Sequence, residues 1–188
     1  NGSIHIGNNC EVKGSASTVN GKIEVGENSR VRDLRTVNRG IFIGNNARVD
    51  GNVKTVNGQV FCGAGVEVTG NVTAVNGRMR CLQGAAVSGN LSNVNGEIEL
   101  QGARIEQDIL THTGHILLLK GTVVEGSIVI RKSRSLSDRF KTLRILISEE
   151  SVVKGDVIVK DEDIRVQLTV NQGGRLLGKP RGVEEVSE

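Results

Sequence analysis

Residues 41–60 read IFIGNNARVDGNVKTVNGQV, and this pattern of apolar, glycine and asparagine positions returns along much of the chain. Ile41 and Ile43 are separated by one residue, and this spacing of two is the period of a β-strand, not of a helix. Gly44 and the pair Asn57-Gly58 interrupt the short apolar runs, as turns between strands do. The segment therefore predicts three short strands joined by three tight corners.

Two sets of positions repeat along the chain with a period of about 19 residues, the signature of a repeat architecture. The first set, the asparagine ladder, consists of Asn20, Asn38, Asn57, Asn76 and Asn95. The second set consists of Val12, Val31, Val49, Val68, Val87, Ile105 and Val124. The pattern resumes at Val153 and at Leu176, which gives about nine coils.

A unit of three short strands cannot bury its own apolar face, but stacked units can. The repeat therefore predicts an all-β fold, a single-stranded parallel β-helix (solenoid) with about nine coils of ~19 residues. A right-handed winding is favoured, because parallel crossover connections are overwhelmingly right-handed. A left-handed β-helix is the alternative, since the segment 43–49 also fits its hexapeptide pattern. Residues 1–178 then form one domain, and residues 179–188 form a C-terminal tail.

The composition excludes several classes of protein. Glycine supplies 25 of the 188 residues and proline only one, which does not fit collagen. Recurrent Val, Ile and Leu argue against disorder, and a net charge of +3 gives no reason to expect nucleic-acid binding. The longest purely apolar run, Ile116–Leu119, is far shorter than the ~20 residues of a membrane helix, so no transmembrane segment is expected.

The asparagine ladder has a structural interpretation. Its members come before glycine in most coils, a place where left-handed backbone geometry is expected and where Asn and Gly tolerate it best. Amides stacked in register can also hydrogen-bond along the solenoid axis. The functional alternative is a row of polar ligand-binding side chains.

Residues 131–144 interrupt the repeat. The step from Val124 to Val153 is longer than an ordinary coil by about ten residues. The segment contains one acidic residue and six basic residues, which are Arg131, Lys132, Arg134, Arg139, Lys141 and Arg144. Loops on rigid scaffolds often carry function, so this basic insertion is a candidate site for an anionic glycan, a lipid head group or an acidic protein. The alternative is a solvated loop that shields one flank of the rod.

Other chemically active residues form no recognisable catalytic or metal-binding set. His112 and His115 are close in sequence but lack an identifiable third ligand, so they are interpreted as exposed corner residues. Cys62 and Cys81 are one repeat apart and are predicted to stack in the core, with a disulfide between them as the lesser alternative. Asp33 and Asp50 lie about one coil apart and are interpreted as solvated corner carboxylates. No cofactor is predicted.

The repeated Thr-Val-Asn-Gly-x-Ile units, such as residues 18–23, resemble the adhesin-type β-repeat proteins of bacteria. Residues 43–53, with the pattern Ile-Gly-x-x-Ala-x-Val-x-Gly-x-Val, also resemble bactofilins, polymer-forming cytoskeletal proteins with a right-handed β-helix. The resemblance covers residues 1 to about 130 well. It implies a bacterial protein with a structural or adhesive role, and it supplies no catalytic residues.

These observations predict a non-catalytic scaffold of the bacterial cell envelope that acts through surface recognition or self-association. Ile4 and Ile6 already form a coil strand, and an uncovered strand edge is a template for pairing. Either further residues cap this end, or the coil ends are the expected site of self-association. A periplasmic or envelope location is expected, or a cytoplasmic one if the chain is bactofilin-like. The alternative function is a β-helix enzyme that acts on polysaccharide or transfers an acyl group.

Overall fold

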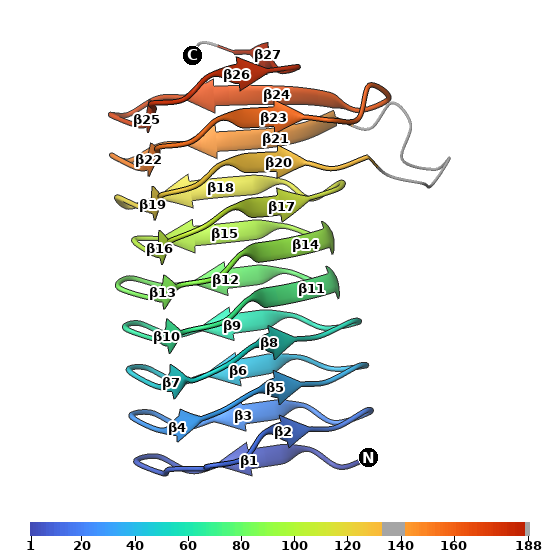
Figure 1. Cartoon of the computed structure of the whole chain (residues 1–188), viewed down its shortest axis with the longest axis vertical. Helices are drawn as coiled ribbons and strands as arrows, with labels where there is room; N and C mark the ends of the chain where they lie inside the picture. Colours follow the sequence, from blue (N-terminus) through green and yellow to red (C-terminus); the bar gives the residue numbers. More distant parts are fainter. Residues whose placement is uncertain (133–141, 187–188) are drawn as a thin grey trace.

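A computed structural model describes residues 1–132 and 142–186, and strands are the only regular elements in this part of the chain. The strands belong to three parallel sheets, A, B and C, and the chain visits them in that order in each coil. Figure 1 shows the coils stacked into a rod with the two termini at opposite ends. The chain is therefore an all-β parallel β-solenoid of about nine coils, and most coils have the predicted length of ~19 residues.

Sheet A has the longest strands and spans the whole rod. Its members are β1 (Ile4–Ile6), β3 (Ile23–Val25), β6 (Ile41–Ile43), β9 (Val60–Cys62), β12 (Met79–Cys81), β15 (Ile98–Gln101), β18 (Ile116–Leu119), β21 (Thr142–Ile147), β24 (Arg165–Val170) and β27 (Glu184–Glu185). Sheet B consists of two-residue strands. Its members are β4 (Arg30–Val31), β7 (Arg48–Val49), β10 (Glu67–Val68), β13 (Ala86–Val87), β16 (Arg104–Ile105), β19 (Val123–Val124), β22 (Val152–Val153) and β25 (Arg175–Leu176).

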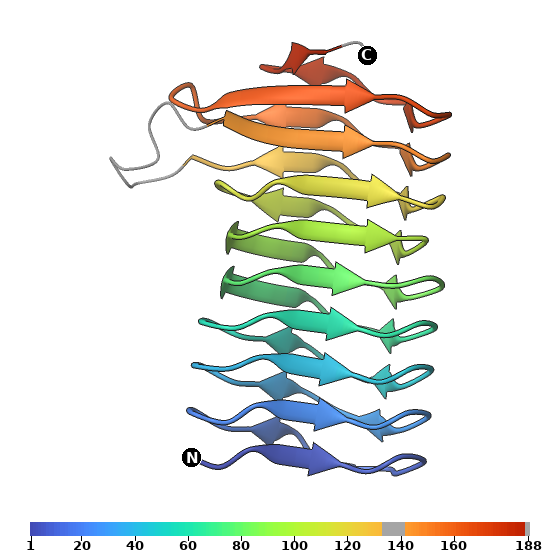
Figure 2. The same ribbon diagram turned by 180° about the vertical axis from the view of Figure 1, so that it is seen from behind.

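Sheet C follows sheet B in each coil and leads back to sheet A. Its members are β2 (Ala16–Ser17), β5 (Leu34–Arg35), β8 (Val53–Lys54), β11 (Val72–Asn76), β14 (Leu91–Asn95), β17 (Ile109–Thr111), β20 (Ile128–Ile130), β23 (Val157–Val159) and β26 (Pro180–Arg181). In Figure 2 the strands of sheet A lie in front and run to the right as the chain rises towards its C-terminus. Front strands that rise to the right define a right-handed winding.

The core is a set of apolar ladders inside the three sheets. One inward ladder runs along sheet A through Ile23, Ile41, Val60, Met79 and Ile98, and each of these side chains is at most 1% exposed. Cys62 and Cys81 are register partners on the next inward ladder, where both are buried free thiols. This confirms their prediction as core residues. A hydrogen bond with the Cys81 thiol, together with burial, raises the pKa of Cys62.

The asparagine ladder lies at the corner between sheets C and A, and its amides hydrogen-bond along the axis as predicted. The Asn57 Nδ2 donates to Asn38 Oδ1 at 3.3 Å, Asn76 donates to Asn57 at 2.9 Å, and Asn95 donates to Asn76 at 3.0 Å. Each amide therefore accepts from the coil above and donates to the coil below. The ladder continues into the hydroxyl of Thr113, which donates to Asn95 Oδ1 at 2.7 Å.

The expectation of left-handed geometry at the asparagine ladder is wrong. Positive φ angles occur instead at the corner between sheets A and B, for example at Asn28 (φ 53°), Asn46 (φ 55°) and Gly65 (φ 66°). The glycine after the ladder has a different cause, because the coils approach one another closely there. A Cβ at Gly77 would collide with the backbone carbonyl of Gly58 in the coil below. Stacking contact, rather than backbone conformation, therefore selects glycine at this position.

The solenoid continues beyond residue 178, into the segment expected to be a tail. Strand β26 pairs with β23, and β27 pairs with β24. Pro180 fits because Val157, its register partner, donates its N–H to the carbonyl of Lys179 at 3.1 Å, so this pairing needs no N–H from Pro180. Proline is tolerated in edge strands for this reason.

Candidate functional site

The outward side chains of sheet C form a continuous row that contains no acidic residue. Register pairing aligns nine positions from the first coil to the last. We call them the C row, and they are Ser17, Arg35, Lys54, Thr73, Ser92, Leu110, Val129, Ile158 and Arg181. The row combines cations, hydroxyls and apolar side chains, so the C row gives this face one sign of charge.

A second outward row runs beside the C row, one residue before the asparagine ladder. Its first five members are valines, and we call them the valine row: Val19, Val37, Val56, Val75 and Val94. In the following coils the same position is occupied by His112, Arg131 and Lys160. The register is established by the N–H groups of Arg131 and Lys160, which donate to the carbonyls of Thr111 and Ile130 in the coils below. The face of sheet C is therefore apolar along the valine row and basic beyond it.

Four exposed cations on this face have no salt bridge within the described part of the chain: Arg35, Lys54, Arg131 and Lys160. Arg35 and Lys54 are also register partners, so two like charges lie side by side. Directly opposed like charges destabilise a sheet. An external anion would relieve this repulsion.

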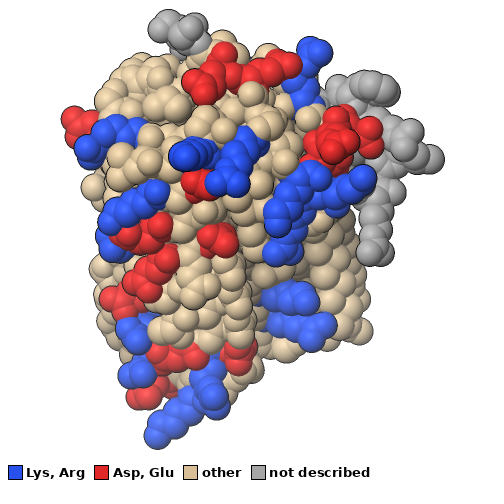
Figure 3. Space-filling view, turned by 45° about the horizontal axis from the view of Figure 1, so that its top comes forward, with Lys and Arg blue, Asp and Glu red and all other residues tan. Residues whose placement is uncertain are grey.

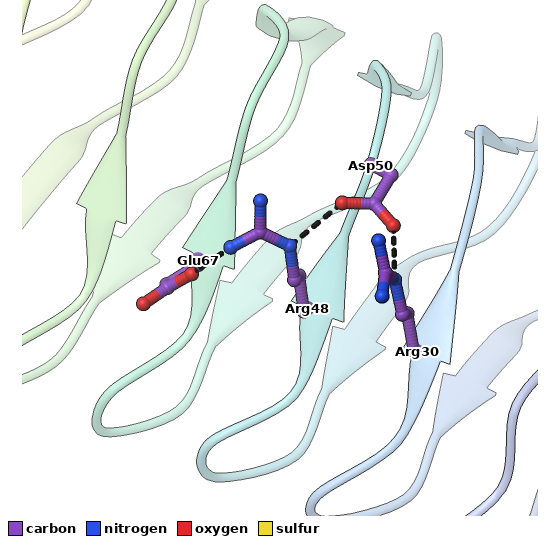
Figure 4. A network of polar contacts seen from close by, with 4 residues as sticks. All are labelled: Arg30, Arg48, Asp50 and Glu67. Atoms are coloured by element: carbon purple, nitrogen blue, oxygen red, sulfur yellow. Dashed lines mark hydrogen bonds and ion pairs between the residues drawn. The ribbon is translucent and has the colours of Figure 1, made fainter.

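Sheet B shows the opposite arrangement, because its outward charges bind one another across coils. Arg30 and Arg48 both bind Asp50, the latter through its Nε at 2.7 Å from Oδ1, and Arg48 also binds Glu67 (Figure 4). Hydrogen bonds from Arg30 and then Arg48 lower the pKa of Asp50. Asp50 is thus an ion-paired residue rather than the freely solvated corner carboxylate that the sequence suggested.

A similar network joins later coils of sheet B. Glu125 lies 2.7 Å from the Lys154 Nζ and 2.5 Å from the Arg104 guanidinium, and the hydrogen bond from Lys154 is the main cause of its lowered pKa. In Figure 3, Lys and Arg are mixed with Asp and Glu on the left of the molecule, whereas Lys and Arg stand without acidic neighbours on the lower right. The distribution of charge therefore differs between faces of the rod rather than between its N-terminal and C-terminal halves.

Carboxylates at the corner between sheets B and C point along the axis and bind the next coil. Asp33 Oδ1 accepts the N–H of Asn52 at 2.8 Å, and this bond is the main cause of the lowered pKa of Asp33. Asp108 accepts the N–H of Ser127 at 2.8 Å, and Asp156 accepts that of Lys179 at 2.8 Å. These carboxylates are structural links between coils, and Asp33 is not simply solvated.

The basic insertion is only partly included in the described residues. Arg134, Arg139 and Lys141 lie outside them, whereas Arg131 and Lys132 are exposed just after β20. Arg144 is not in a loop, because β21 begins at Thr142, and its side chain is exposed on sheet A. Arg131 and Arg144 therefore lie on different faces, and Arg131 belongs with the cations of sheet C.

The two histidines do not form a metal site in the described structure. His112 is half-buried on the sheet C side of its corner, while His115 is exposed and its Nδ1 accepts the Arg144 N–H at 3.0 Å. Among the described residues no group of three or more His, Cys, Asp or Glu could hold a metal ion. That part of the chain also contains no helix with the length and apolar character needed to span a bilayer.

The ends of the rod carry the exposed apolar side chains. Val19 in the first coil is 50% exposed, and Leu177 near the other end is 60% exposed. Val170 and Val186, also near the C-terminal end, complete the large hydrophobic side chains that are exposed among the described residues. Val170 and Leu177 also line a shallow hollow with Leu168. Both ends are therefore candidate contact surfaces.

Comparisons of the chain with protein-family models, with curated proteins and with solved structures find no match. The resemblance to adhesin-type repeats and bactofilins therefore stays a prediction. Sequence reasoning missed Arg35, Lys54 and Lys160, because it considered runs of charge along the chain. Aligning the coils by their asparagine ladder would have brought the first two into one column and shown that the column lacks acidic residues.

Proposed function

We propose that the chain is a non-catalytic scaffold of the bacterial cell envelope that self-associates through its coil ends. The observation that supports this most is the gathering of exposed large apolar side chains in the first and last coils, at Val19 and Leu177 above all. Isolated exposed apolar residues are ordinary on a protein surface, but Val170, Leu177 and Val186 gather near the C-terminal end and favour contact there.

The backbone of the end strands also supports this proposal. Ile4 donates its N–H to Lys22, and Ile6 accepts the N–H of Gly26, so these two residues bond towards β3. In a parallel strand the intervening residue, His5, directs its N–H and C=O to the opposite side. At the other end, Val186 donates to Leu168, which leaves Glu185 directed outward in the same way. Such edges are templates for further strand pairing.

Sedimentation velocity across a range of concentrations tests self-association of the full chain. We expect the average mass of the wild-type chain to rise with concentration and that of Leu177→Lys to stay near the monomer. Thr69→Lys is the matched control, because Thr69 is exposed just after β10 in a central coil and the substitution adds the same charge. A wild-type chain that remains monomeric throughout would overturn the proposal.

A second pair of variants tests the strand edge itself. His5→Pro removes the outward N–H without removing a bond to β3, and we expect it to weaken association. His5→Ala removes the same imidazole and its contact with Glu24 but keeps the N–H, so its association should match the wild type. Equal association by both variants would mean that end contacts do not use the edge of β1.

The cellular location is part of the same proposal. The resemblance of residues 18–23 to adhesin-type repeats supports a periplasmic or envelope-associated protein, and a bactofilin-like protein would be cytoplasmic. Fractionation of cells that produce the complete natural protein distinguishes these locations. Recovery in a soluble cytoplasmic fraction would contradict an envelope role.

A further inference from the structure

We propose that the outer face of sheet C binds the surface of an anionic phospholipid bilayer. The C row and the valine row cover this face from the first coil to the last, and neither row contains Asp or Glu. The face therefore complements a negative plane, while sheet B carries balanced ion pairs such as Arg48–Asp50.

The cations that have no salt bridge to another described residue lie at two levels of the face. Arg35 and Lys54 are neighbours in adjacent coils near the N-terminal end, and Arg131 and Lys160 lie four coils and more further along. At a strand spacing of ~4.8 Å, roughly 20 Å separates Lys54 from Arg131. This separation exceeds the Debye length at physiological salt, about 8 Å, so the two groups would contact an extended anionic surface independently.

Acidic residues near this face do not neutralise it. Asp33, Asp108 and Asp156 direct carboxylate oxygens to backbone N–H groups of the next coil. Asp161 is 3% exposed, and Glu162 belongs to the turn beyond Lys160, not to an outward strand row. Arg181 is paired with Asp156, and Arg35, Lys54, Arg131 and Lys160 have no salt bridge to the described acidic residues, so these four remain available to an external partner.

The apolar part of the face favours a bilayer over a nucleic acid or a glycan. The valine row lies beside the cations, where its methyl groups can enter the headgroup region as Arg35 and Lys54 meet phosphate. Nucleic-acid and sugar sites commonly use aromatic stacking. The chain has no Trp or Tyr, and Phe42 and Phe61 are outward residues of sheet A, on another face.

Vesicle co-sedimentation of the full chain tests the proposal. We expect binding to vesicles of phosphatidylcholine with about one-third phosphatidylserine, and little binding to phosphatidylcholine alone. Each Lys or Arg near such a surface contributes roughly five-fold to binding. The double variant Arg35→Glu with Lys54→Glu should therefore reduce the partition coefficient by about 20-fold or more.

The matched control is Lys13→Glu with Arg32→Glu, which changes the net charge equally but alters exposed residues that follow the sheet B positions of the first two coils. It should bind nearly as well as the wild type, and an equal loss in both double variants would overturn the assignment to sheet C. If reversal at Arg35 and Lys54 impairs folding, Arg35→Gln with Lys54→Gln replaces it, with an expected loss of about 20-fold from the two cations alone.

A further binding experiment distinguishes an anionic lipid surface from other polyanions. Inorganic polyphosphate and duplex DNA are offered in place of vesicles. Binding of either by the same face, without binding to the anionic vesicles, would overturn the lipid assignment. Vesicle binding is measured at protein concentrations where sedimentation velocity shows only monomer, so self-association does not contribute to it. The lipid proposal and the self-association proposal can therefore fail independently of each other.

Discussion

At the scale of single residues, glycine is selected here by contact between coils. Gly77 follows the asparagine ladder, and a Cβ on it would overlap the carbonyl of Gly58 in the coil below. Its backbone is not left-handed, so conformational freedom does not explain it. The same obstruction exists at Gly58, against the equivalent carbonyl one coil earlier, whereas at Gly96 a positive φ of 141° adds a conformational reason for glycine.

Gly77→Ala is expected to destabilise the chain by about 3 kcal/mol, because two backbone segments must separate to admit one methyl group. Gly14→Ala is the matched control, since no atom lies within 4 Å of the place its Cβ would occupy and its φ is not positive. Its effect should stay within about 0.5 kcal/mol. Equilibrium unfolding in urea measures both, and similar losses would contradict the stacking explanation.

At the scale of strands, polar side chains connect the same strand of successive coils. The network of β4, β7 and β10 joins three coils through Arg30, Arg48, Asp50 and Glu67. Isolated exposed ion pairs contribute little to stability, but several charges that form a network contribute more. Asp50 is its centre, because two guanidinium groups bind one carboxylate.

The network makes part of the stability dependent on pH. The folded-state pKa of Asp50 is lowered from its ordinary value of 3.8 by the hydrogen bonds from Arg30 and Arg48. Its contribution is therefore complete above about pH 4 and is lost as the pH falls through the lowered value. We expect Asp50→Asn to be less stable than the wild type near neutral pH, and the difference to shrink towards about pH 2.

Urea unfolding at several pH values measures this difference. Glu106→Gln is the control, because Glu106 is exposed and belongs to the same sheet B surface but has no ion pair among the described residues. Its stability difference from the wild type should vary little with pH. A constant difference for Asp50→Asn between neutral and acid pH would show that the carboxylate charge is not what stabilises the network.

At the scale of the whole molecule, the fold follows from periodicity and the surface does not. Inward positions such as Ile41 and Cys62 must hold a buried apolar side chain in every coil, so they repeat visibly in the sequence. The amides of the asparagine ladder are equally predictable, because each needs an identical neighbour. Outward positions are under no such requirement, and Arg35 and Lys54 become a column only after the coils are aligned.

The differences from prediction also have physical causes. Left-handed geometry occurs at Asn28 and Asn46, where the chain turns tightly from sheet A to sheet B, and asparagine alone does not reveal which corner is tighter. The continuation past Lys179 depends on the pairing direction of Pro180, which only the register determines. Local sequence therefore identified the corners but could not assign their geometry.

A stacked rod protects its middle coils more than its ends, because a central coil is covered on both sides. The three thiols lie in coils with different protection. Cys10 is exposed in the first coil, whereas Cys62 and Cys81 are each 1% exposed in central coils. The hydrogen bond with the Cys81 thiol, together with burial, raises the pKa of Cys62, which further reduces its thiolate fraction. We expect a water-soluble alkylating reagent to modify one thiol rapidly under native conditions and the other two only through opening of the rod.

Mass spectrometry of timed samples counts the modified thiols and assigns them to residues. Addition of urea should make Cys62 and Cys81 react together, because opening either one separates the same pair of coils. Cys10→Ser is the control variant and should show no rapid phase. Rapid modification of all three thiols would mean that the central coils open as readily as the first, and absence of free thiol at Cys62 and Cys81 in the unfolded chain would reveal a disulfide between them.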